Sequence, residues 1–384
     1  LDKSVSRPDL MMQCQEYLSG VDRELLISCR DKLVLKASEC GLESSPMIGW
    51  KAANLAEIDR LAGTETVPPW FAVTNYAFNR MLKQPVGSAE YLAAGARTLG
   101  EAIQFVLRRA DLDNQAKSIE IRKLWTETDL PEDLQLTVSE AHKQLVDEDA
   151  FVALRSSSCD EDTETVMRAG EFDSFLFVQG LDSLFDHLRL TWSGLWTERD
   201  LYSRDADGTT MKCPAGGVVV QRMVCSRVSG VLQTVNMARG ELREMLINVS
   251  LGLGEGIVSG LVAADLITVV KDFEAGEDPT HLNYLTNDKP EQMVFDQRRG
   301  YGTRLEETLY HQRLRPALEY FELCEIVARA SALEVGYGYP LDIEFAIEDE
   351  RLWLLQARPI ATFRAELNKT LEQFPLGIEP GVLK

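Results

Sequence analysis

The chain has 384 residues, of which 45% are hydrophobic, so it can form one large domain or two to three lobes around a real core. A formal net charge of -21 argues against non-specific nucleic-acid binding, and no apolar run reaches the roughly 18 residues that a membrane helix needs. Seven scattered cysteines without a CxxC spacing and a polar start, Leu1-Asp2-Lys3-Ser4, favour a cytoplasmic protein without a zinc or disulfide framework.

Hydrophobic periodicity predicts the elements of the first half of the chain. Residues 1–40 carry no readable motif and are expected to form an N-terminal extension. Leu55, Ile58 and Leu61 fall at helical spacing, which predicts a helix from about residue 52 that ends at Gly63. The next predicted elements are an extended entry into a strand at 67–74, helices within 88–148 and a strand at 151–155.

The second half begins with three consecutive valines that predict a strand over 216–224. A helical pattern over about 303–334 is interrupted at Pro316, and glycines at 336 and 338 close it. Alternating helices and strands predict an α/β or α+β fold with mixed sheets. The expected parts are a first lobe at 41–215, a second lobe at 216–363 and a C-terminal tail or linker at 364–384.

A hairpin is predicted near the end of the chain. Leu341–Ile347 alternates at period two, residues 349–351 form the expected turn, and residues 352–358 return. The predicted cross-strand pairs are Asp342 with Arg358, Glu344 with Gln356 and Glu348 with Leu352.

This register places three useful side chains on one face of the hairpin. Glu344 and Gln356 offer hard oxygen ligands of the kind that Mg²⁺ takes beside phosphate oxygens. Arg358 offers a fixed fork that suits phosphate. A surface hairpin with ordinary cross-strand pairing is the competing interpretation.

Two further segments point to an anionic ligand. Arg155 stands at the end of a strand, before three serines that supply hydroxyl and backbone donors. Lys51 begins a helix, where a cation opposes the helix dipole unless an anion lies between them. The alternatives are an arginine paired with the acidic run 160–162 and a solvated lysine. A glycine-rich loop at 252–256 lacks the Gly-Lys-Ser/Thr of a P-loop.

In order, these segments resemble the ATP-binding domain of phosphoenolpyruvate synthases and pyruvate phosphate dikinases, which rifampicin phosphotransferases share. The resemblance covers about residues 41–361. The segments that carry it are Gly49–Glu57, Val67–Thr74, Val152–Ser157, Gln221–Val224, Ile247–Glu255 with Val258–Gly260, and Asp342–Glu344 with Leu355–Ile360.

The resemblance implies an ATP-grasp-like fold of two lobes that enclose ATP and Mg²⁺. It also implies the site residues. Lys51, Arg155 and Arg358 would contact the phosphates and carry the catalysis, Gly170 and Ser174 would line the phosphate loop, Gln221 would lie near the adenine or ribose, and Glu344 and Gln356 would bind Mg²⁺.

In the family, ATP phosphorylates a histidine on a separate swivelling carrier domain. The four histidines of this chain lack the Thr-Ser-His-Ala-like context of that carrier, and they are His142, His187, His281 and His311. We therefore expect this chain to perform the ATP half-reaction, with the carrier in cis or in trans and no nucleic-acid or membrane partner.

Departures from the family pattern keep other functions open. Trp50 stands where the family usually has a glycine, and tryptophan does not readily adopt a positive φ. Glu171 and Phe172 replace paired glutamines, and Ser174 replaces a threonine. The alternatives are an antibiotic phosphotransferase, an ATP-driven ligase, or a degenerate module that senses ATP without transferring phosphate.

Overall fold

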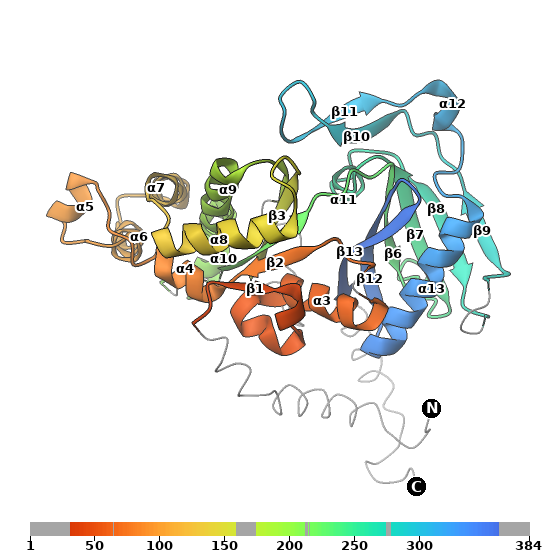
Figure 1. The fold of residues 1–384 in the computed structure, drawn as a ribbon, viewed down its shortest axis with the longest axis horizontal. Helices are drawn as coiled ribbons and strands as arrows, with labels where there is room; N and C mark the ends of the chain where they lie inside the picture. The colour runs from red at the N-terminus through yellow and green to blue at the C-terminus, as the bar shows by residue number, and fades with distance from the viewer. Residues whose placement is uncertain are drawn as a thin grey trace, which may run out of the picture.

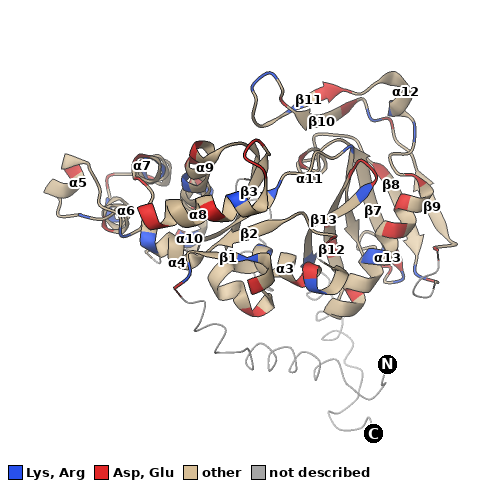
Figure 2. Cartoon of the chain, viewed as in Figure 1, with Lys and Arg blue, Asp and Glu red and all other residues tan. Residues whose placement is uncertain are grey.

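The computed structural model describes residues 31–63, 65–158, 174–211, 214, 216–273 and 278–360. They form two lobes, each built around its own antiparallel sheet, and the two sheets lie side by side along the long axis (Figure 1). Acidic and basic side chains are interspersed over both lobes rather than gathered by sign (Figure 2). Among the described helices, none is both long and apolar enough to cross a membrane.

The sheet of the first lobe has five strands in the order β1-β2-β5-β3-β4. The strands predicted at 67–74, 151–155 and 216–224 are confirmed as β2, β3 and β5. The bounds are Val34–Lys36 for β1, Trp70–Val73 for β2, Gly216–Arg222 for β5, Val152–Ser158 for β3 and Ser174–Val178 for β4.

Helices cover one face of this first sheet. The helical region predicted at 88–148 is confirmed as four helices, and Trp125 and Trp192 lie fully buried in the core beneath them. The bounds are Asn75–Met81 for α4, Ala89–Ala93 for α5, Leu99–Arg108 for α6, Asn114–Glu127 for α7, Glu132–Leu145 for α8, Leu181–Ser193 for α9 and Glu198–Ala206 for α10.

The opposite face of the first sheet packs on α3, which spans Ser45–Ala62 and ends at Gly63 as predicted. Apolar residues of α3, including Leu55 and Ile58, share one core with the second lobe. The helix therefore lies between the two sheets and packs against both (Figure 1).

The sheet of the second lobe has six strands in the order β13-β12-β6-β7-β8-β9. Helix α13 packs its apolar side on one face, whereas the short helix α11 and the hairpin β10–β11 belong to the other side (Figure 1). The bounds are Val228–Gln233 for β6, Glu244–Leu251 for β7, Glu255–Val258 for α11, Asp265–Val270 for β8, Leu282–Leu285 for β9, Glu291–Phe295 for β10, Thr303–Glu307 for β11, Tyr310–Arg313 for α12, Tyr320–Tyr337 for α13, Leu341–Glu348 for β12 and Arg351–Pro359 for β13.

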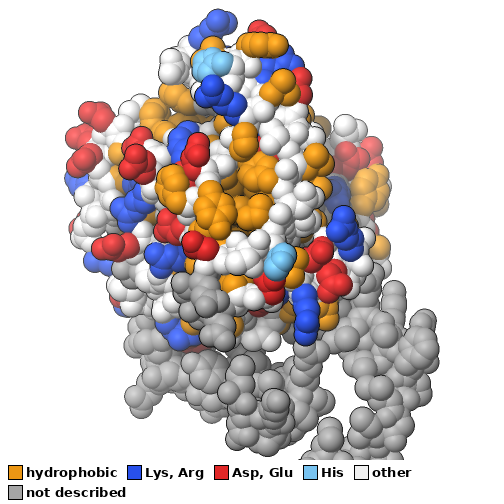
Figure 3. Space-filling model, turned by 90° about the vertical axis from the view of Figure 1, so that its right-hand side faces the viewer, with side chains coloured by type: hydrophobic (Ala, Val, Ile, Leu, Met, Phe, Trp, Pro, Cys, Tyr) orange, Lys and Arg blue, Asp and Glu red, His pale blue; other side chains and the backbone are white. Residues whose placement is uncertain are grey.

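The side of the second lobe that carries β9, α12 and α13 shows a group of hydrophobic side chains in Figure 3. Exposed apolar residues of these three elements are Leu285, Tyr310, Tyr320, Phe321 and Val335.

Two expectations differ from the structure in detail. The helical pattern over 303–334 is wrong in its first part, because Thr303–Glu307 pairs antiparallel with β10 and the long helix begins only at Tyr320, after Pro316. All pairings between the named strands are antiparallel, whereas mixed sheets were expected. The lobe boundary after residue 215 stays a prediction, although β5 pairs within the first sheet.

Candidate functional site

The predicted hairpin is formed by β12 and β13, and it carries the candidate site on the face turned away from α13. Its register confirms that Glu344 lies opposite Gln356 and that Asp342 lies opposite Arg358. The turn is one residue shorter than predicted, because Glu348 pairs with Arg351 instead of Leu352.

A β-bulge explains why the predicted pairs farther from the turn, Glu344–Gln356 and Asp342–Arg358, are nevertheless correct. The register shifts between Glu344 and Phe345, which leaves Leu355 without a cross-strand partner. The extra residue restores the predicted pairing below it. It also turns the Leu355 carbonyl toward the first lobe, where this oxygen accepts a hydrogen bond from Arg155 Nη1 at 2.8 Å.

Arg155 joins the two lobes at this point. The residue belongs to β3 of the first sheet, and its Nη2 donates to Gln356 Oε1 at 2.6 Å and to Glu344 Oε2 at 3.1 Å. Its side chain is only 16% exposed. The two oxygens that were predicted as metal ligands therefore converge on a single cationic nitrogen.

Arg358 and Asp342 extend the polar face toward the base of the hairpin. Arg358 donates to Asp342 Oδ2 from Nε at 3.0 Å and from Nη2 at 2.9 Å. Both line a hollow of about 360 Å³ together with Glu344. The rest of its lining comes from neighbouring strands and from the segment around α11, namely Val231, Asn248, Ile257, Val258, Val262 and Ala264.

Lys51 lies in the helical turn that follows a kink in α3. Gly49 interrupts the helical backbone with φ of 78°, and a Cβ atom there would lie 2.0 Å from the Ser157 carbonyl oxygen. The helix restarts at Trp50, and the Ala52 N–H donates to Ser157 Oγ at 3.1 Å. This hydroxyl caps the first turn in place of the side chain that glycine lacks.

The cap also relates Lys51 to Arg155. Ser157 and Arg155 are two residues apart on β3, so their side chains leave the same face of the strand. The first turn that contains half-buried Lys51 thus lies against the strand that presents Arg155.

The kink resolves the expected problem at Trp50. The positive φ of this turn belongs to Gly49, and Trp50 itself has a helical backbone. Tryptophan therefore occupies this position without the strain that a positive φ would impose.

The other predicted residues have different surroundings. Gln221 is buried on β5, and its Nε2 donates to the Pro68 carbonyl oxygen at 3.4 Å. Ser174 is exposed at the start of β4 and lies directly opposite Arg155. Gly170 lies outside the described residues, as do Glu171 and Phe172.

Sequence reasoning left Asp342 and Asn248 out of the site. Asp342 stands two residues before Glu344, so the period-two pattern already placed both on one face. Asn248 occupies a middle strand of the second sheet, where a polar residue interrupts an apolar run. This polar residue within an apolar strand was the sequence signal that could have placed Asn248 in the site.

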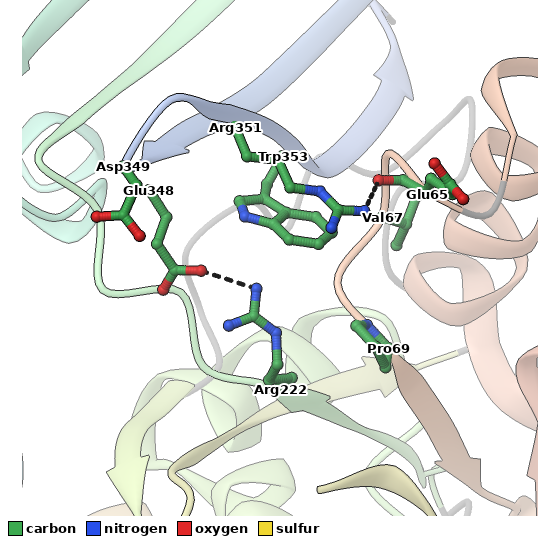
Figure 4. Close-up of a pocket in the computed structure, with 8 residues that line it drawn as sticks. All are labelled: Glu65, Val67, Pro69, Arg222, Glu348, Asp349, Arg351 and Trp353. Atoms are coloured by element: carbon green, nitrogen blue, oxygen red, sulfur yellow. Dashed lines mark hydrogen bonds and ion pairs between the residues drawn. The ribbon is translucent and has the colours of Figure 1, made fainter.

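A second hollow, of about 480 Å³, lies at the turn of the same hairpin (Figure 4). It contains none of the predicted site residues. Its lining joins the turn to the end of β5 and to the segment before β2, and consists of Glu65, Val67, Pro69, Arg222, Glu348, Asp349, Arg351 and Trp353.

Comparison with known proteins shows which family the chain is similar to. The family model for the pyruvate phosphate dikinase AMP/ATP-binding domain matches residues 45–375. A rifampicin phosphotransferase from a Streptomyces species is 31% identical over 331 residues, which cover 86% of this chain and 36% of that protein.

Two archaeal relatives are similar to a comparable extent. The phosphoenolpyruvate synthase of Pyrococcus furiosus is 31% identical over 356 residues, which cover 84% of this chain and 43% of that protein. A probable phosphoenolpyruvate synthase of Pyrococcus horikoshii is 30% identical over 394 residues, which cover 91% of this chain and 47% of that protein. The chain thus spans less than half the length of these three relatives.

Proposed function

The chain belongs to the pyruvate phosphate dikinase AMP/ATP-binding domain family, and we propose that it binds Mg·ATP between its lobes and phosphorylates a histidine on a separate carrier domain. One observation carries this proposal. Oxygens of Glu344 and Gln356 in the second lobe converge on one guanidinium nitrogen of Arg155 from the first lobe. A site shared between lobes suits a ligand that lies between them.

The residues fit a divalent metal. A carboxylate and an amide oxygen already meet one cation within 3.1 Å, so a small cation placed there would find two oxygen ligands. Mg²⁺ commonly takes one or two protein ligands and completes its shell with water and phosphate oxygens. When bound, Mg²⁺ would neutralise charge on the nucleotide phosphates.

The proposed roles of the cations follow from their positions. Arg155 would exchange its bonds with Glu344 and Gln356 for bonds to the transferred phosphoryl group. Arg358 would hold a second phosphate from the hairpin, and Lys51 a third from the capped turn of α3. Fixed cations around a developing negative charge act by positioning and electrostatic stabilisation.

The remaining predicted residues would bind the rest of the nucleotide. Gln221 lies near the end of β5, from which the chain passes to the second lobe, and would face the adenine or ribose. Ser174 would join the phosphate loop, because β4 pairs it with Arg155. Gly170 would belong to the same loop, which precedes β4 in the sequence. An ATP-grasp-like arrangement is part of this proposal.

Calorimetry of Mg·ATP binding tests the site. Glu344→Gln removes the charge but keeps an oxygen, and Arg358→Ala removes the second phosphate contact. We expect both variants to bind Mg·ATP at least tenfold more weakly than the parent, which corresponds to a loss of about 1.4 kcal/mol each. Unchanged affinity in both variants would contradict the assignment.

Product analysis separates the proposed transfer from the alternatives. The chain is incubated with Mg·ATP, with and without a histidine-bearing carrier domain of this family. Carrier-dependent release of AMP supports the dikinase half-reaction. ADP release would indicate a simple kinase or ligase, and binding without any product would indicate a sensor. The final acceptor, pyruvate or an antibiotic, is then found by adding each to the phosphorylated carrier.

A further inference from the structure

The connector between the lobes is held by the hairpin that carries the candidate site. Within the described residues, the chain passes from the first sheet to the second once, between Arg222 and Val228. Along this connector, the Arg227 N–H donates to the Ile347 carbonyl oxygen at 2.9 Å, and Arg227 Nε donates to the Asp349 carbonyl oxygen at 2.8 Å.

Glu348 is the central group of this contact. Its Oε1 accepts the Cys225 N–H at 2.7 Å, and its Oε2 accepts Arg222 Nη2 at 2.9 Å. The carboxylate side chain is 21% exposed and the arginine 26%. One carboxylate at the hairpin turn thus binds both the last residue of β5 and the middle of the connector.

Trp353 extends the contact to the segment before β2. The guanidinium carbons of Arg222 and Arg351 lie 4.7 Å and 3.8 Å from the centre of its ring. Arg351 Nη2 also donates to the Glu65 carbonyl oxygen, and the Leu354 N–H donates to the Thr66 carbonyl oxygen at 2.7 Å. Figure 4 shows Arg222, Arg351 and Trp353 around the hollow of about 480 Å³.

The hairpin contacts the rest of the molecule at two points, the connector at its turn and the first sheet at its bulge. At its turn, β12–β13 holds the connector through Glu348. At the bulge, Leu355 and Gln356 hold Arg155 of the first sheet. A rotation of one lobe against the other must therefore strain one of these two contacts. The hollow leaves room at the turn for such a movement, because close-packed side chains would block it.

We propose that Glu348, Arg222 and Trp353 act as a hinge clamp that sets the angle between the lobes, and so the distance of Arg155 from Glu344 and Gln356. These are positioning residues, and the role in nucleotide binding rests on the proposed function. Hinges in two-lobed enzymes are formed by a few residues between rigid bodies. Here a carboxylate on the ligand-carrying hairpin restrains those residues directly.

Glu348→Gln tests the clamp, with Glu350→Gln as the matched control in the same turn. Glutamine retains an acceptor for the Cys225 N–H but presents an amide where Arg222 needs an acceptor. We expect Glu348→Gln to bind Mg·ATP about tenfold more weakly, because fewer molecules hold the binding orientation. Small-angle scattering should show a larger radius of gyration for this variant without nucleotide and the parent value at saturating Mg·ATP.

A double-mutant cycle distinguishes positioning from a general loss of stability. The loss of affinity in Glu348→Gln combined with Arg222→Gln should be smaller than the sum of the two single losses, since both changes break the Glu348–Arg222 interaction. Additive losses would overturn the proposal, as would identical affinity and scattering for Glu348→Gln and Glu350→Gln. If Glu348→Gln does not fold, Arg222→Lys replaces it, because lysine keeps the charge but loses the planar fork.

The design separates failure of the clamp from failure of the proposed function. If the parent protein itself shows no heat of binding with Mg·ATP, the proposed function fails. The scattering comparison without nucleotide then decides the clamp alone. A larger radius in Glu348→Gln than in Glu350→Gln supports it, and equal radii overturn it.

Discussion

Replacing Arg155 with methionine separates the two tasks that this residue is proposed to perform. Methionine keeps a long flexible stem and removes the cation. The change leaves three acceptors without their donor, namely the carbonyl oxygen of Leu355 and the side-chain oxygens of Glu344 and Gln356. Hydrogen bonds to charged groups contribute about 1.5–3 kcal/mol, so the contact between the lobes should weaken by about 2 kcal/mol.

The effect on nucleotide binding follows from the same contacts. In the complex Arg155 would bond to the phosphates, and a hydrogen bond to a charged group contributes about 1.5–3 kcal/mol. Mg·ATP affinity should therefore fall roughly 10- to 150-fold in Arg155→Met. Calorimetry measures this loss, and Arg108→Met, a change in an exposed arginine of α6, is the control.

The effect on the metal alone has the opposite sign. A guanidinium about 4 Å from a divalent ion repels it by about 2 kcal/mol even at the dielectric constant of water. Arg155→Met should therefore bind Mn²⁺ without nucleotide more than tenfold more tightly than the parent, as followed by electron paramagnetic resonance. Equal Mn²⁺ affinity in the two proteins would refute the idea that Arg155 and the metal address the same oxygens.

Further predictions concern stability and the start of α3. Gly49→Ala should cost about 3 kcal/mol in urea unfolding, because it combines a positive φ with a Cβ placed 2.0 Å from a carbonyl oxygen, whereas Gly63→Ala, at φ of 90° with open space, should cost about 1 kcal/mol. Ser157→Ala removes the helix cap and should cost about 1 kcal/mol. Burial raises the pKa of Asp59 from 3.8 to about 6, so the folded state binds this proton more tightly and stability falls as the pH rises from about 4 to 6. Asp59→Asn should therefore stabilise by about 1 kcal/mol at pH 7.5, discounted for partial exposure, and give no gain near pH 3.5 in thermal melts. Trp50→Gly should leave Mg·ATP affinity within about twofold of the parent and cost about 1 kcal/mol of stability, measured by calorimetry and urea unfolding.

The hairpin shows how far periodicity predicts a site. Alternation from Leu341 to Ile347 placed Asp342 and Glu344 on one face, and the register confirms both of their cross-strand partners. The prediction nevertheless had a longer turn and no bulge, and these two differences cancel below Glu344. The alternation of apolar and polar residues does not reveal a bulge. The carbonyl oxygen of the bulged residue Leu355 is bonded by Arg155, which is distant in the sequence.

Contacts between distant segments were beyond sequence reasoning for the same reason. The residues of β3 and the hairpin that meet at Arg155 are about two hundred positions apart. Residues 303–307 illustrate the related error. Their Glu, Leu and Arg content favours a helix, but pairing with β10 satisfies their backbone in a strand. Local propensity is overridden where a partner strand is available.

The kink at Gly49 bears on the alternative in which the chain only senses ATP. That alternative drew on Trp50, because a glycine usually stands there in the family and a positive φ would strain tryptophan. The structure assigns the positive φ to Gly49, where a close approach to Ser157 also requires a glycine. The backbone that presents Lys51 therefore needs no positive φ at residue 50. Support for a degenerate site must then come from Glu171 and Phe172. If Trp50→Gly bound Mg·ATP more tightly than the parent, Trp50 would again support the ATP-sensing alternative.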